Sequence, residues 1–110
     1  MMRLPMSAAG AGLLRSLLLR AGASRETVHL VTYRAREWQS LILDGEWHEF
    51  ALRIPGDGRD AVAQLLIAGI EDHEFAIPGQ IVADITAIIS PTTDRDAAIE
   101  VRIEALTIAE

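Results

Sequence analysis

Apolar positions near the start of the chain recur every three or four residues, and this spacing predicts a helix over residues 7–21. Arg15 and Arg20 lie off the apolar face. Ser7 is a residue type that caps helix N-termini, and Gly22 is typical of the position just after a helix. The apolar face itself consists of four leucines, Leu13, Leu14, Leu17 and Leu18.

Strand-like patterns follow the helix and predict three strands before the middle of the chain. β-Branched residues favour a first strand over 27–34, and residues 38–43 favour a second. Asp44–Gly45 is typical of a two-residue hairpin turn, because both residue types tolerate positive φ. Residues 46–54 then alternate with a period of two, which predicts a third strand with His48, Phe50, Leu52 and Ile54 on one face.

The second half of the chain predicts a helix over about 58–70, with Asp57 as its N-cap. A short extended piece at 74–77 follows it. The buried stripe of this helix should comprise Val62, Leu65, Leu66 and Ile70.

Two further strands are expected over 80–89 and 98–108, separated by a polar loop at 90–97. In the first of these, the apolar face should hold Ile81, Ala83, Ile85, Ala87 and Ile89.

These elements predict an α+β fold for a single small domain covering residues 1–110. We expect an antiparallel or mixed sheet of about five strands, with two helices mainly on one face. The order along the chain would be α-β-β-β-α-β-β. No resemblance to a known family is specific enough to name.

Composition excludes several chemistries and favours self-association. The chain has no cysteine, which excludes disulfides, thiolate catalysis and Cys-based metal sites, and it has no lysine for a Schiff base. The mean hydropathy of +0.22 is high for a small domain, so we expect a homo-oligomer. The absence of lysine and asparagine from the sequence is consistent with the coding bias of a GC-rich bacterial genome. No apolar run approaches the ~20 residues of a membrane span, and Arg15 and Arg20 interrupt the N-terminal run, so a cytoplasmic location is expected.

Charge divides the chain into a basic front and an acidic body. Residues 1–36 hold six arginines and one glutamate, a net charge of +5, whereas residues 37–110 hold four arginines and fifteen acids, a net charge of −11. We expect the basic helical segment 1–25 to pack on the domain or on a neighbouring subunit. The acidic body argues against nucleic acid as a partner, and the expected packing of the helix leucines on the sheet or on another subunit argues against a membrane surface.

Candidate chemistry centres on His48, His73 and Asp84, which could form a metal or acid–base site with neighbouring acids. However, His48 and Glu49 are adjacent on a strand and should point to opposite faces, and no metal-binding spacing is present. Asp84 interrupts an apolar strand, so we expect either an ion pair with an arginine of the front or an exposed position.

Three functions remain open after the sequence is read. The first is a non-catalytic domain that acts through homo-oligomerisation or contact with an unknown protein, with an interface formed by Leu13, Leu14, Leu17, Leu18 and Trp47. The second is a small enzyme or metal-binding protein that uses His48, His73 and Asp84. The third, weaker one is an arginine-arm protein that binds nucleic acid or an anionic membrane. No cofactor is expected for the first.

Overall fold

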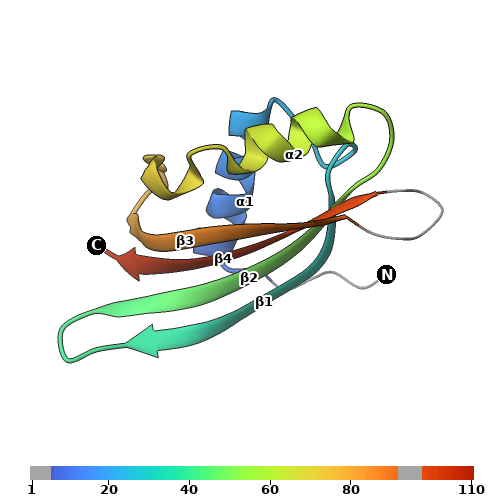
Figure 1. Ribbon diagram of the computed structural model, residues 1–110. Helices are drawn as coiled ribbons and strands as arrows, with labels where there is room; N and C mark the ends of the chain where they lie inside the picture. The colour runs from blue at the N-terminus through green and yellow to red at the C-terminus, as the bar shows by residue number, and fades with distance from the viewer. Residues whose placement is uncertain (1–5, 92–97) are drawn as a thin grey trace.

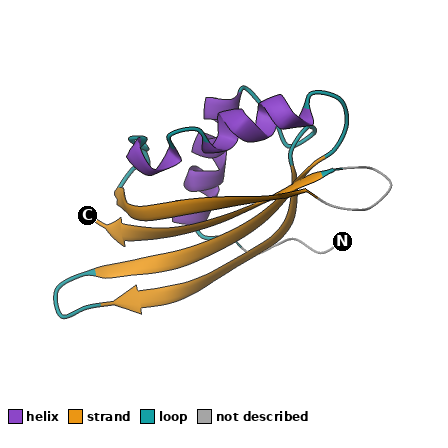
Figure 2. Ribbon diagram, in the orientation of Figure 1, coloured by secondary structure: helices purple, strands orange, loops and turns teal. Residues whose placement is uncertain are grey.

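Two helices and a four-stranded antiparallel sheet make up the computed structural model, which describes residues 6–91 and 98–110 (Figure 1). The elements in chain order are α1 (Ala8–Ala21), β1 (His29–Gln39), β2 (Asp44–Ile54), α2 (Arg59–Ile67), the short 3₁₀ helix η1 (Ile70–Asp72), β3 (Gln80–Pro91) and β4 (Ile99–Ala109). The strand order is β1-β2-β4-β3, so two hairpins lie side by side and the second strand of each is central. Both helices lie on the same face of the sheet (Figure 2).

The α+β class is confirmed, but the expected fifth strand is wrong: of the predicted second strand, 38–43, residues 38–39 belong to β1 and residues 40–43 form the turn. β1 continues without a break to Gln39, and the chain turns through Ser40–Leu43 instead of at Asp44–Gly45. The Ser40 N–H donates to the Leu43 carbonyl across 2.9 Å and closes the turn. The order observed among the described residues is therefore α-β-β-α-β-β.

Gly45 lies inside β2, where it serves close backbone approach and not a turn. A Cβ at this position would collide with the Thr107 carbonyl of the neighbouring strand β4. Asp44–Gly45 therefore has the sequence of a hairpin turn, but its glycine is needed because the two strands approach closely.

α1 begins and ends where the sequence predicts. The Ser7 side chain accepts a hydrogen bond from the Gly10 N–H at 3.1 Å, which satisfies one free donor of the first turn. Gly22 adopts φ +61° and ends the helix.

α2 is shorter than predicted, and its cap differs. It starts after Gly58 with no side-chain cap, so Asp57 does not cap it, and it ends at Ile67. Gly69 has φ +63°, which breaks the helix before η1 begins. Leu66 and Ile70 are buried as expected, but the side chain of Leu65 is 53% exposed.

Two expectations for the segment after η1 also need correction. Residues 74–77 form no strand, and Ile77 makes only an isolated bridge with Gln80. β3 has an irregularity between Val82 and Asp84, which turns Val82 toward the core and leaves Ile81 exposed. The predicted loop 90–97 begins later than expected, and its residues 92–97 lie outside the described part of the chain.

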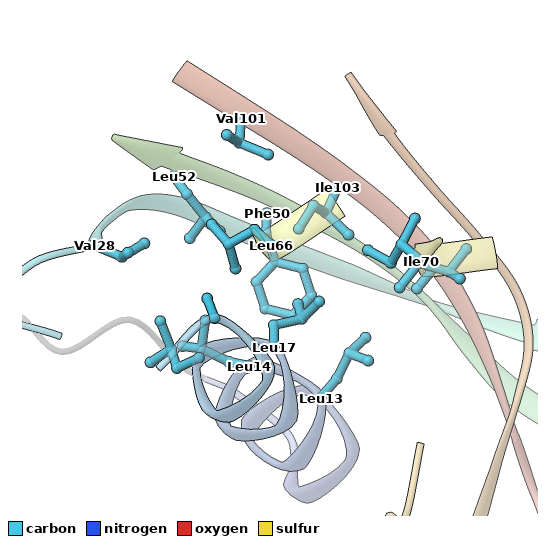
Figure 3. Packing of buried hydrophobic residues seen from close by; sticks show 14 of the residues in the cluster. Leu13, Leu14, Leu17, Val28, Phe50, Leu52, Leu66, Ile70, Val101 and Ile103 are labelled. Atoms are coloured by element: carbon cyan, nitrogen blue, oxygen red, sulfur yellow. The ribbon is translucent and has the colours of Figure 1, made fainter. Parts of the chain in front are cut away.

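An aliphatic core with one central phenylalanine joins the helices to the sheet. Leu13, Leu14 and Leu17 of α1 point toward Phe50 of β2 and Leu66 of α2 (Figure 3). Because strand residues alternate between faces, this core occupies one face of the sheet. The other face is left without a covering helix in the described structure.

Candidate functional site

The face of the sheet opposite the two helices has no packing layer among the described residues; we call it the open face. Its apolar members are Trp38, Trp47, Ile81, Ile88, Leu106 and Ile108, and its charged members include Arg34, Arg36, Glu49, Asp84, Arg102 and Glu104. Strand alternation places them there, because their neighbours in sequence face the core. A mixture of apolar and charged residues is common on protein surfaces, so the arrangement of these residues is what bears on function.

The strand register arranges the open face in rows that cross all four strands. One row reads Arg36, Trp47, Leu106 and Asp84, so its two apolar side chains are central and its two charges lie on opposite edges. The next row toward the β1–β2 turn reads Trp38, Gly45, Ile108 and Ile81.

A third row of the open face carries most of the charge. It reads Arg34, Glu49, Glu104 and Thr86, and Arg34 Nη2 lies 3.2 Å from Glu49 Oε2. Glu49 and Glu104 are direct cross-strand neighbours of like charge, which is unfavourable within the sheet. Arg34, Arg36, Trp47 and Glu49 also line a shallow hollow beside β1.

The three candidate metal or acid–base residues do not converge. His48 faces the core, whereas Asp84 lies on the open face on the other side of the sheet. His73 follows η1, is exposed, and packs edge-on against Phe75 with 4.6 Å between ring centroids. Among the described residues, no three His, Cys, Asp or Glu side chains lie close enough to hold a metal ion.

Asp84 takes the exposed position that was one of its two expected environments. It forms no ion pair with any residue in the described ranges, 6–91 and 98–110. Besides Arg34, Arg20 of the front also reaches a partner distant in sequence: it donates to the Leu66 carbonyl at 2.6 Å and to the Ala68 carbonyl at 2.5 Å. Arg20 thereby ties α1 to the C-terminal end of α2, where the helix dipole favours a cation.

His48 is instead the centre of a buried chain of hydroxyl groups. Its Nδ1 lies 2.8 Å from the Tyr33 hydroxyl, its Nε2 lies 2.8 Å from Thr107 Oγ1, and the Tyr33 hydroxyl lies 3.4 Å from Ser7 Oγ. The side chain of His48 is fully buried, and burial lowers its pKa; burial also raises the pKa of Tyr33. Both ring nitrogens have hydroxyl partners inside the core, so His48 itself is enclosed, whereas Ser7 at the end of this chain of hydroxyl groups is only part-buried.

The predicted interface residues divide between the two faces of the sheet. Leu13, Leu14, Leu17 and Leu18 are buried in the core of their own chain, so their side chains are already covered. Trp47 is half-buried and lies on the open face, in the row between Arg36 and Leu106.

The tip of the β1–β2 hairpin is a surface that the sequence reasoning missed. Leu41 is fully exposed and Ile42 is 88% exposed, because both belong to the turn and not to a strand. Three successive apolar residues after Ser40 break the period of two, and this is the signal that could have identified them as a turn.

A scan against protein-family models, a search of curated proteins and a search of solved structures each found no match. In the described part of the chain, no helix has the length and apolarity required to cross a bilayer.

Proposed function

We propose that this chain is a small non-catalytic domain that forms a homodimer by stacking the open faces of two sheets. The observation that carries the proposal is the row of Arg36, Trp47, Leu106 and Asp84, with its apolar centre and its opposite charges at the two edges. The proposal includes a bacterial origin, supported by the absence of lysine and asparagine, and a cytoplasmic location, supported by Arg15 and Arg20, which interrupt the N-terminal apolar run.

The strand order makes the open face complementary to itself. A two-fold axis parallel to the strands, placed between two stacked sheets, sets β1 over β3 of the partner and β2 over β4 of the partner. Arg36 then faces Asp84 of the partner subunit, and Trp47 faces Leu106 of the partner subunit. Stacked sheets of this kind lie about 10 Å apart with their strands rotated by about 30°.

The flanking rows supply both favourable and unfavourable pairs. Trp38 meets Ile81 of the partner subunit, which adds apolar contact near the hairpin end. In the charged row, Glu49 meets Glu104 of the partner subunit, and Arg34, already 3.2 Å from Glu49, partly offsets this repulsion. The dimer therefore depends on the apolar rows and on the Arg36–Asp84 pairs.

Sedimentation equilibrium with open-face variants tests the proposal. The unaltered chain should sediment at twice its mass of 12.0 kDa, and Trp47→Glu or Ile88→Glu should sediment as a monomer because each places a carboxylate in the stacked face. Leu65→Glu is the matched control, since Leu65 is an exposed leucine of α2 on the helix side. A monomeric unaltered chain, or a control that dissociates equally, would refute the stacked dimer.

A further inference from the structure

The β1–β2 hairpin ends in an ordered turn that holds aliphatic side chains in solvent. The Ser40 N–H donates to the Leu43 carbonyl at 2.9 Å, and Ser40 Oγ accepts from the Leu43 N–H at 3.1 Å. Leu41 and Ile42 occupy the two central positions of this turn, away from α1 and α2 (Figure 1). Burial of an exposed aliphatic side chain is favourable, so the tip is suited to contact with an apolar site.

Acidic residues surround the apolar tip and indicate the charge of its partner. Glu37 and Glu46 are direct partners across the hairpin, and Asp44 is paired with Gln39 two positions nearer the turn. An anionic lipid surface would repel these carboxylates, whereas an apolar site with a basic rim would attract them.

A groove on the outer side of α1 has those properties. Leu14, Leu18, Leu19 and Ala23 form its apolar lining, and Arg15 and Arg25 are its basic lining residues. Leu19 is 74% exposed, and neither of these arginines forms an ion pair with another described residue.

We propose that the hairpin tip of one copy, Leu41–Leu43, docks into the α1 groove of a second copy. The aliphatic tip would contact the exposed Leu19 and the half-buried Ala23 of the partner subunit. Asp44 and Glu46 would approach Arg15 and Arg25 of the partner subunit. The exposure of Leu41 shows that the tip does not occupy the groove of its own chain.

This contact is independent of the stacked open faces, because the groove lies on the helix side of the molecule. It joins two different surfaces, so repetition would either close a ring or extend a filament. Together with the stacked dimer it would link dimers into a larger assembly, so the sedimentation tests of the stacked dimer carry Leu41→Ser/Ile42→Ser in every chain to remove the docking contact. Either contact could exist without the other.

Cross-linking between single-cysteine copies tests the docking, and the absence of native cysteine makes each label unique. Copies with Ile42→Cys, mixed with mass-tagged copies with Leu19→Cys, should form the mixed disulfide at least about tenfold faster than with Leu65→Cys copies, because docking raises the effective concentration. Leu65 is the control because it is also an exposed leucine on a helix. Equal rates for the two pairs would overturn the proposal.

Charge exchange separates specific docking from random collision. Arg15→Glu with Arg25→Glu in the Leu19→Cys copy should abolish the rate advantage, and Asp44→Arg with Glu46→Arg in the Ile42→Cys copy should restore it. An advantage that persists without the arginines, or a failure of the exchange to restore it, would overturn the proposal.

Two further measurements complete the test. The mixed disulfide should also form in an Arg36→Asp background, so a failure of the stacked dimer is distinguishable from a failure of the docking. Co-sedimentation with phosphatidylcholine–phosphatidylserine vesicles that is lost in Leu41→Ser/Ile42→Ser would assign the tip to lipid and overturn the docking.

Discussion

At the scale of single residues, the most constrained group is the buried imidazole of His48. Its two nitrogens contact the hydroxyls of Tyr33 and Thr107, each at 2.8 Å. A neutral imidazole needs one donor and one acceptor, and hydroxyl groups can rotate to supply either. The ring is therefore satisfied while neutral, and a proton added to it would place a charge in the core.

Stability should fall as the pH falls through the range in which an exposed histidine titrates. Burial lowers the folded-state pKa of His48, so below the unfolded value of about 6.5 the unfolded chain binds more protons than the folded chain. The free energy of unfolding should drop by up to about 1.4 kcal/mol per pH unit until the folded-state pKa is reached. Urea unfolding between pH 8 and pH 5 measures this.

The variant His48→Gln isolates the contribution of this residue to the pH dependence. Glutamine does not titrate, so the variant should be less stable at pH 8 but lose less stability on acidification. Parallel pH profiles for the two proteins would show that His48 is not the group responsible.

Gly10 is a second constrained residue. Alanine at this position should lower the stability of the protein, although Gly→Ala inside a helix usually raises it. Alanine in place of glycine inside a helix normally stabilises by about 1 kcal/mol. A Cβ on Gly10 would collide with the Tyr33 hydroxyl, which also contacts His48. Gly10→Ala should therefore lower the free energy of unfolding in urea. A more stable variant would contradict the tight packing of α1 on Tyr33.

At the scale of elements, the spacing of apolar residues predicted correctly those helices and strands whose conformation depends on packing against the core. The leucine face and both caps of α1 are where the pattern predicts them, as are the alternating residues of β2. The β1–β2 turn was wrong because Asp44–Gly45 has the composition of a turn but serves close backbone approach to Thr107. Such long-range contacts leave no local signal.

The candidate site could likewise be predicted from the sequence only in part. The strand pattern placed Trp47 on the face opposite the core residues of β2, and it lies on the open face. The row that joins Arg36 to Asp84 depends on strand order and on the irregularity near Val82, and neither can be obtained from single-strand patterns. Sequence reasoning therefore identified individual residues but not their grouping.

The buried leucines of α1 pack the helix against the core of its own chain. Substitutions on the buried and exposed faces of the helix should therefore change the free energy of unfolding by different amounts. Leu17 is completely buried, so Leu17→Ala should lower the free energy of unfolding by about 2–5 kcal/mol. Leu19→Ala, on the exposed side of the same helix, should change it by no more than about 0.5 kcal/mol. Equal effects in urea unfolding would contradict the packing of α1.

At the scale of the whole molecule, the basic front is distributed and not concentrated in one patch. Arg15 and Arg25 lie beside the α1 groove, Arg20 binds carbonyls at the end of α2, and Arg34 and Arg36 lie on the open face. In the described part of this segment, Arg34 alone forms an ion pair. Leucine packing attaches α1 to the sheet, and Arg15, Arg25 and Arg36 form no ion pair with another described residue.

The most direct test of the stacked dimer is a charge exchange between the edges of the open face, read by sedimentation equilibrium. Arg36 and Asp84 are three strand spacings apart within one chain, about 14 Å, so they cannot pair without a second copy. Arg36→Asp and Asp84→Arg should each weaken the dimer, and the double variant should return to twice the chain mass of 12.0 kDa. A double variant that remains as dissociated as the single variants would contradict the stacked arrangement.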